Sequence, residues 1–176
     1  MLRLIDTHAH LDMKGYKGKV EDVLARALEA GVDRIINIAS TDDSNKKVLK
    51  LVNTHSMIYG TLGIHPHYAK TVNGKIMDLI QKEAASNEKI VAIGEVGLDF
   101  HYNNSEPLIQ KSVLREFVRI AKSLNLPLVI HDRKAHEETY SILKEERAEK
   151  VGGVYHCFSG DYEYAKKVMD LGFNIS

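Results

Sequence analysis

The residues of this chain with the greatest capacity for chemistry are histidines, of which nine occur among 176 residues. Most of them fall at or just after the end of a short apolar run that is typical of a buried strand. Six potential metal donors share this placement: His8, His10, His65, Glu95, His131 and His156. Because the carboxyl ends of the strands in a parallel barrel meet at one rim, we expect these side chains to surround one cavity.

The first donors lie in the segment Asp6-Thr7-His8-Ala9-His10. Side chains two residues apart on a strand point to the same face, so Asp6, His8 and His10 share one direction. Two imidazoles ~6–7 Å apart along a strand can converge on one divalent ion. A His-x-His pair alone is a weak signal, and a solvated loop is the alternative. The further donors downstream favour a metal site.

Glu95 follows an apolar run in the segment IVAIGEVGLDF. Its two oxygens can bridge two metal ions, which an imidazole cannot do, although a solvated carboxylate is the alternative. The flanking Gly94 and Gly97 would let backbone or substrate approach closely. Asp99 could orient a histidine ligand or cap a helix, and the sequence leaves both roles open.

His131 ends the buried-strand pattern LPLVIHDR, where an unpartnered imidazole would be unfavourable, so a ligand or a hydrogen bond is expected. Arg133 has the planar fork suited to a phosphate, and a salt bridge at the rim is the alternative. His156 and Cys157 lie in GGVYHCFSG. Strand alternation sends these two side chains opposite ways, so we expect Cys157 to be a small buried apolar residue packed against helices.

A loop follows the third apolar run, where His65 and His67 flank Pro66. One of these histidines could donate to a phosphate oxygen, and both could be surface residues. Three other loop residues could stack on a nucleobase, although aromatic loop residues are common: Tyr68, His101 and Tyr102.

The elements that must position these groups are short apolar runs that alternate with longer amphipathic segments. Strands are predicted over residues 2–6, 34–39, 57–63, 90–94, 126–131, 153–157 and 172–175. Helices are predicted over 20–30, 43–53, 75–86, 106–124, 135–148 and 162–171. Gly31 is placed as the C-cap of the first helix, and Pro107 suits the first turn of the fourth.

This alternation of seven strands with six helices predicts parallel βαβ units. A doubly wound open sheet and a barrel both fit the pattern. No Gly-x-Gly-x-x-Gly loop opens a helix after a strand, and polar residues gather at strand ends, so a TIM-type (β/α) barrel is favoured. No linker rich in Pro, Gly or Ser divides the chain, which predicts a single domain over residues 1–176.

The composition, with 44% hydrophobic and 27% charged residues, is that of a globular protein. The net charge is zero, so no global field attracts the chain to DNA or to an anionic membrane, and any DNA contact must be local. We expect no membrane association, because the sequence contains neither a signal peptide nor a long apolar span. Cys157 is the only cysteine, which excludes an internal disulfide and favours a cytoplasmic location.

Five stretches together resemble the TatD family of metal-dependent deoxyribonucleases, part of the amidohydrolase-like barrel group. They are IDTHAHLD, GIHPH, GEVGLDF, LPLVIHDR and GGVYHCFSG, the last followed by GFNIS, and they occur in the family's order from one end of the chain to the other. The resemblance implies two divalent ions, for which Zn, Mn, Mg and Ni remain open. It assigns His8 and His10 to one ion, His131 and His156 to the other, and Glu95 to a bridge between them.

The same resemblance implies a reaction and its catalytic residues. Glu95, His65 and Arg133 would act on the scissile phosphate, with His65 and Arg133 on the substrate side. The ion pair would activate a water for in-line attack. The expected activity is hydrolysis of phosphodiester bonds in DNA, exonucleolytic at single-stranded or damaged ends.

The sequence departs from the family after its seventh predicted strand, which ends near Ser176. Family members carry a further Asp ligand, in a Glu-Thr-Asp context after an eighth strand, and a complete barrel needs about 250 residues. We therefore predict an incomplete barrel without the eighth βα unit, which binds divalent metal but hydrolyses DNA poorly. Unpaired edges on the first and seventh strands favour self-association.

Two alternative functions remain open. One is an amidohydrolase-like hydrolase of small amides or esters, since similar ligand sets activate water toward carbonyl groups. Glu95, where many such enzymes have a modified lysine, and Arg133 favour the nuclease. The other alternative is an inactive truncated fragment that lacks the C-terminal catalytic Asp.

Overall fold

One curled sheet of seven parallel strands organises the molecule, a computed structural model that describes residues 3–176. The strands are neighbours in chain order: β1 (Leu4–Ala9), β2 (Val32–Asn37), β3 (Ile58–Leu62), β4 (Ile90–Asp99), β5 (Leu128–Arg133), β6 (Gly153–His156) and β7 (Phe173–Ile175). The fold prediction of parallel strands in a barrel-type (β/α) arrangement is confirmed.

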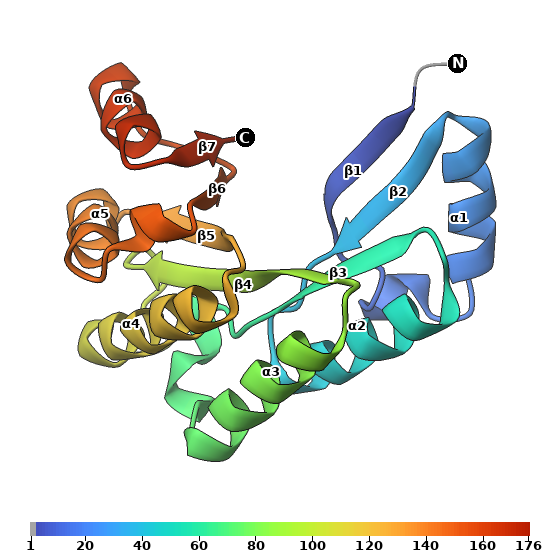
Figure 1. Ribbon diagram of the computed structural model, residues 1–176, viewed down its shortest axis with the longest axis horizontal. Helices are drawn as coiled ribbons and strands as arrows, with labels where there is room; N and C mark the ends of the chain where they lie inside the picture. The colour runs from blue at the N-terminus through green and yellow to red at the C-terminus, as the bar shows by residue number, and fades with distance from the viewer. Residues whose placement is uncertain (1–2) are drawn as a thin grey trace.

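Six α-helices connect the strands and lie along the outer side of the curled sheet (Figure 1). They are α1 (Val20–Glu29), α2 (Asp42–Thr54), α3 (Gly74–Ser86), α4 (Pro107–Leu124), α5 (His136–Glu145) and α6 (Tyr162–Asp170). Three short 3₁₀ helices lie in the connections: η1 (Lys14–Tyr16), η2 (Pro66–Thr71) and η3 (Ala148–Lys150). No α-helix within residues 3–176 is long and apolar enough to span a bilayer.

Local signals in the sequence set several helix ends. Thr41 caps α2 by accepting a hydrogen bond from the backbone N–H of Ser44 at 3.0 Å. Gly31 has a φ of +89° just after α1, as expected of the residue that ends a helix in the left-handed conformation. Pro107 is the first residue of α4, where its missing N–H would have had no helical partner. The placement of Pro107 is confirmed as predicted, whereas the C-cap of α1 is Ala30 and Gly31, predicted as the cap, is the next residue.

The core lies between the sheet and this outer layer of helices. Leu62, Ile93 and Ile130 are completely buried on neighbouring strands, and Phe117 and Val118 of α4 are completely buried against them. Burial on both faces of the central strands β3, β4 and β5 explains why they read as apolar runs without polar alternation. The core fixes the curl of the sheet and therefore the rim on which the polar residues gather.

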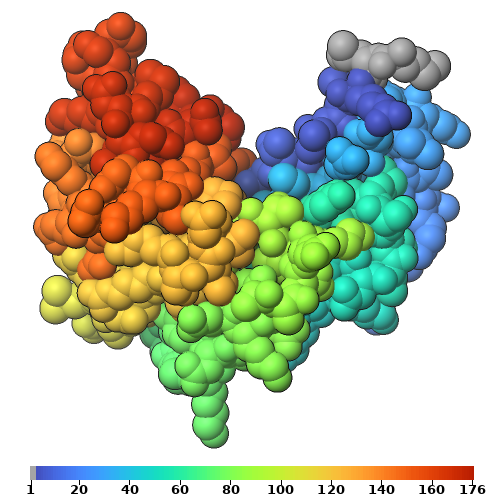
Figure 2. Space-filling view, in the orientation of Figure 1, coloured from blue at the N-terminus to red at the C-terminus, as the bar shows by residue number. Residues whose placement is uncertain are grey.

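The sheet does not close on itself. Within residues 3–176, strand β1 pairs only with β2, and β7 pairs only with β6. Figure 2 shows the resulting notch between the N-terminal strands, in blue, and the C-terminal part, in red.

Several predicted boundaries differ from the structure. The fourth strand was predicted to end at Gly94 but extends to Asp99, because Gly97 and Asp99 pair with His131 and Arg133 of β5. The first strand begins at Leu4 and continues to Ala9; Leu2, part of the prediction, lies outside the described residues. The predicted helix over 135–148 ends at Glu145 and is followed by η3.

Candidate metal centre

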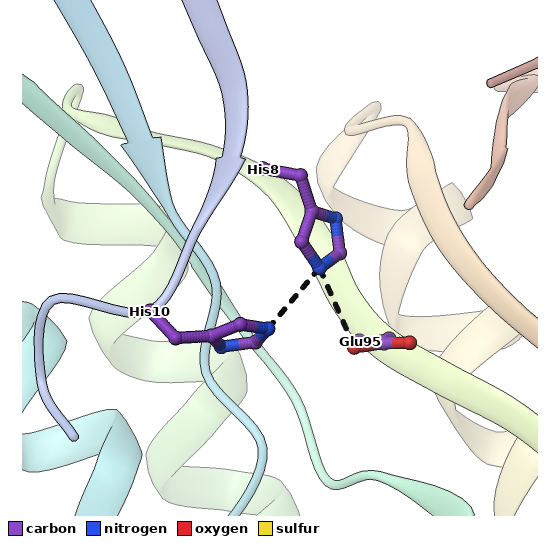
Figure 3. A group of neighbouring side chains, drawn as sticks. All are labelled: His8, His10 and Glu95. Atoms are coloured by element: carbon purple, nitrogen blue, oxygen red, sulfur yellow. Dashed lines mark hydrogen bonds and ion pairs between the residues drawn. The ribbon is translucent and has the colours of Figure 1, made fainter. Parts of the chain in front are cut away.

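The first part of the site is built by the end of β1. The Nε2 atoms of His8 and His10 lie 3.2 Å apart, so the two rings converge as the strand alternation predicted (Figure 3). The Nδ1–H of His10 donates to the carbonyl of Ile38 at 3.0 Å. This bond fixes the tautomer of His10 and leaves its Nε2 lone pair directed at the ring of His8. Such an arrangement suits a pair of metal ligands.

Glu95 lies at the centre of the site on β4 and is only 5% exposed. Its Oε2 is 3.7 Å from Nε2 of His8, and its Oε1 is 3.1 Å from Nδ1 of His131. Oε1 also lies 4.0 Å from Nε2 of His65. The two carboxylate oxygens therefore face two different groups of imidazoles, which is the arrangement that a bridging ligand requires.

In the part of the chain that the structure describes, two groups of three donors have ligand atoms within 4.8 Å of one another: His8, His10 and Glu95, and His65, Glu95 and His131. The second group contains His65 in the place where the sequence prediction had His156. His156 reaches the same rim, since it pairs with His131 across β5 and β6 and its ring stacks on His8 with centroids 3.3 Å apart. The individual ligand roles stay predictions.

A second layer of hydrogen bonds supports the histidines through Asp99, which is fully buried. Its Oδ2 lies 2.9 Å from Nε2 of His67 and 3.1 Å from Nε2 of His131. Its Oδ1 accepts from the backbone N–H groups of His101 and Tyr102 at 3.0 and 2.9 Å. Asp99 therefore orients histidines, which is one of the two roles that the sequence left open. The backbone N–H groups that it accepts from belong to a turn, so it does not cap a helix.

The buried position of the site sets its charge states. Burial, with the neighbouring His156 and His10, lowers the pKa of His8 to about 4, although Glu95 acts in the opposite direction. Burial and His131 lower the pKa of His65 to about 3. Neutral imidazoles are the forms that bind metal ions.

The carboxylate of Glu95 is ionised in the same environment. Burial alone would raise the pKa of Glu95, but the hydrogen bond from His131 and the electrostatic interactions with the surrounding histidines lower it to about 2. Burial acts against protonation of His131, but the hydrogen bonds and charges of Glu95 and Asp99 outweigh it and raise the pKa of His131. An anionic carboxylate among imidazoles is a donor set that fits divalent transition metals.

Arg133 lies at the rim of the site. Arg133 is exposed at the end of β5, and within residues 3–176 it forms no ion pair, so the alternative of a salt bridge at the rim is not realised. Its guanidinium carbon lies 4.8 Å from the centroid of the Tyr102 ring.

The prediction of a buried Cys157 is wrong: this residue is exposed, with a φ of +53°. It follows the end of β6, so strand alternation does not apply to it.

Some of the residues that position the site gave no clear signal in the sequence. Asn45 of α2 accepts from the N–H of Gly63 and donates to its carbonyl, both at 3.0 Å, and so holds the segment that leads to His65. Gln110 of α4 donates to the carbonyl of Asp99 and accepts from its N–H. A buried polar residue within a helical apolar stripe is the only signal that could have indicated them.

Comparison with known sequences identifies the family. The profile of the family described as TatD related DNase matches residues 5–176. YabD of Bacillus subtilis, named an uncharacterized metal-dependent hydrolase, is 40% identical over 173 residues, which make up 98% of this chain and 68% of YabD. A Shigella flexneri relative named 3'-5' ssDNA/RNA exonuclease TatD is 33% identical over 172 residues, or 98% of this chain and 66% of that protein. The chain thus spans about two thirds of the length of these relatives.

Solved structures agree with the sequence comparison. The crystal structure of YjjV, a TatD homologue from Escherichia coli, matches with a TM-score of 0.91 and 33% identity over 98% of this chain and 67% of YjjV. A TatD family hydrolase from Entamoeba histolytica matches with a TM-score of 0.90 and 26% identity, over 98% of this chain and 64% of that chain. On sequence and on fold, this chain belongs to the TatD family of metal-dependent hydrolases.

Proposed function

We propose that the chain hydrolyses phosphodiester bonds at the ends of single-stranded DNA with the help of two divalent ions. The observation that supports this most directly is the position of Glu95, whose two oxygens face His8 on one side and His131 on the other at 3.7 and 3.1 Å. His8 and His10 would hold one ion, and His131 and His156 the other. Ions bound there supply a nucleophile from water at neutral pH and offset the charge of the phosphate.

The remaining residues would bind and orient the substrate. His65, whose ring centroid lies 4.3 Å from that of His131, would contact an oxygen of the scissile phosphate. The exposed guanidinium of Arg133 forms no ion pair or side-chain hydrogen bond among residues 3–176 and could take a phosphate through two parallel N–H groups. The Shigella flexneri relative is named for action on single-stranded DNA and RNA, which supports a nucleic-acid substrate.

Other parts of the proposal concern the whole chain. A single TatD-like domain over residues 1–176 and a cytoplasmic location stay predictions. Self-association through the two open sheet edges is part of the proposal as well, because β1 and β7 each have an unpaired side.

Metal stoichiometry tests the bridging role of Glu95. We expect about two ions per wild-type chain, as in two-metal sites in general, and loss of both in Glu95→Ala. Glu88→Ala is the matched control, because Glu88 is an exposed carboxylate just before β4. Full occupancy in Glu95→Ala would contradict the bridge.

The activity is tested on single-stranded DNA and on a panel of amides and lactones. Turnover of the panel with no cleavage of DNA would replace the proposed reaction with the amidohydrolase alternative.

A further inference from the structure

An exposed aromatic residue lies beside the site and has no role in holding metal. Tyr102 is 54% exposed in the turn that follows β4, and the guanidinium carbon of Arg133 lies 4.8 Å from its ring centroid. Exposed aromatic rings and guanidinium planes are the surfaces on which proteins stack the unpaired bases of nucleic acids. The pair therefore offers an aromatic face for stacking and N–H groups that can donate hydrogen bonds to a phosphate, both at one point of the rim.

A series of ring contacts connects this pair to the metal centre. The His131 and His65 rings are 4.3 Å apart, His65 and His67 are 4.4 Å apart, and His67 lies edge-on to Tyr102 at 5.4 Å. Two ring-to-ring steps thus lead from the residue proposed to meet the scissile phosphate to the exposed tyrosine. A nucleotide bound at that phosphate would have its neighbour at Tyr102.

The turn that carries Tyr102 is held in place before any substrate binds. The carboxylate of Asp99, which also contacts His131, accepts from the N–H of Tyr102 at 2.9 Å. The N–H of Phe100 donates to the carbonyl of Arg133 at 2.9 Å, so both halves of the pair are fixed to the same two strands. Ser105 donates to the carbonyl of His67 at 3.0 Å and ties the turn to η2. A preorganised surface loses little conformational entropy when a ligand binds.

We infer that Tyr102 and Arg133 form a stacking platform for the nucleobase next to the scissile phosphate, with Arg133 free to turn to the backbone of the strand. This inference rests on the proposed function and adds to it a reason for single-strand preference. A base must be unstacked from its own neighbours before it can lie on a tyrosine. Pairing and stacking at the end of a duplex oppose this unstacking, so a single strand binds more readily. Because every base has a π-face, the platform would tolerate any sequence.

The test uses a short single strand that carries the fluorescent base 2-aminopurine at its terminal nucleotide. Stacking quenches this fluorophore, so binding is read without cleavage in EDTA and, in Mn²⁺, from the quenching that precedes turnover. Wild type and Tyr102→Phe should quench it in at least one of these conditions. Tyr102→Ala should remove the quenching and weaken binding roughly 5- to 100-fold. On a strand with an abasic terminal nucleotide, Tyr102→Ala should bind like wild type.

Tyr59→Ala is the control variant, because Tyr59 of β3 also lies beneath an arginine, with Arg34 5.9 Å from its ring centroid, but belongs to the amino-terminal half of its strand. It should quench like wild type. Equal weakening of the abasic and the base-containing strand by Tyr102→Ala, or no binding of either strand by wild type, would overturn the inference. Tyr102-dependent quenching without any DNA hydrolysis would refute the proposed reaction and leave the platform standing.

Discussion

At the scale of single residues, the site contains two histidines that are kept neutral, His8 and His65, and a carboxylate that is kept charged, Glu95. His8 and His65 are kept neutral by burial, which lowers the pKa of each ring. His10 is oriented by one hydrogen bond to the carbonyl of Ile38, which directs its Nε2 at the site. The carboxylate of Glu95 is stabilised by the imidazoles around it, and its pKa is lowered to about 2. His8, His65 and Glu95 therefore hold the protonation states that metal binding needs, whereas His131, whose pKa is raised by Glu95 and Asp99, must give up a proton to become a ligand.

These shifts predict that the metal-free chain loses stability as the pH falls. The pKa of His8 falls from 6.5 to about 4 and that of His65 from 6.5 to about 3, so below pH 6.5 the unfolded chain binds protons that the folded chain does not. Near pH 5, each of these two rings should lower the free energy of unfolding by on the order of 1–2 kcal/mol. The Tm should therefore drop by roughly 5 °C from its value near pH 7.

Two other groups, His131 and Glu95, also make the stability of the metal-free chain depend on pH. The raised pKa of His131 works in the opposite direction, since its contribution is present at low pH and is lost as the pH rises. The contribution of Glu95 is lost only below about pH 4.5. Calorimetry of the metal-free protein, with His8→Asn and His65→Asn as comparisons, measures the effect. The two variants should lose less stability on acidification than wild type, and a Tm that is constant or higher near pH 5 would contradict the assignment.

At the scale of elements, the pairing of β4 with β5 decides where the donors lie. Gly97 pairs with His131, and a Cβ on Gly97 would overlap the carbonyl oxygen of His131. Its φ of +148° is also one that residues with a side chain rarely adopt. Close approach of the two strands brings Glu95 within reach of His131, so a glycine two residues after Glu95 is part of the geometry of the site.

Gly97→Ala should therefore be severely destabilising, because the strands must separate or the backbone must adopt a strained conformation. We expect a loss of about 3 kcal/mol or more in the free energy of unfolding, together with weaker metal binding. Gly74→Ala is the matched control: nothing lies within 4 Å of the added Cβ at the start of α3, and the change should be within about 0.5 kcal/mol. Urea denaturation measures both. A Gly97→Ala protein as stable as the control would show that the strands can adjust.

At the scale of the whole molecule, the open sheet is the dominant feature. The notch in Figure 2 lies between the first and the last strands, and both of these edges carry exposed apolar side chains. Leu4 and Ile5 of β1 are 43% and 52% exposed, and Ile175 of β7 is 39% exposed. An unpaired strand edge with apolar side chains is a template for pairing with another chain.

We expect the chain to associate with itself at high concentration through these edges. Light scattering should give a mass that rises with concentration for wild type and rises much less for the double variant Ile5→Lys with Ile175→Lys, since charged edges resist pairing. Leu108→Lys is the control, because Leu108 is 78% exposed on α4, and it should behave like wild type. A wild-type chain that stays a monodisperse monomer at every concentration would exclude edge pairing.

The sequence by itself determined the alternation of strands and helices and the residue types at the strand ends. These follow from local periodicity: apolar runs predict buried strands, and His8, His10, Glu95, His131 and His156 each stand beside such a run. Residues at helix ends such as Gly31 and Pro107 were predictable for the same reason.

Only the tertiary structure decided how these residues meet. Glu95 contacts histidines 87, 30 and 36 positions away in the chain, namely His8, His65 and His131, and the curl and register of the sheet set those distances. The full length of β4 and the exposure of Cys157 depend likewise on which backbone groups find partners on neighbouring strands. Periodicity along the chain gives the direction of a side chain, but hydrogen bonding and packing between distant segments give its neighbours.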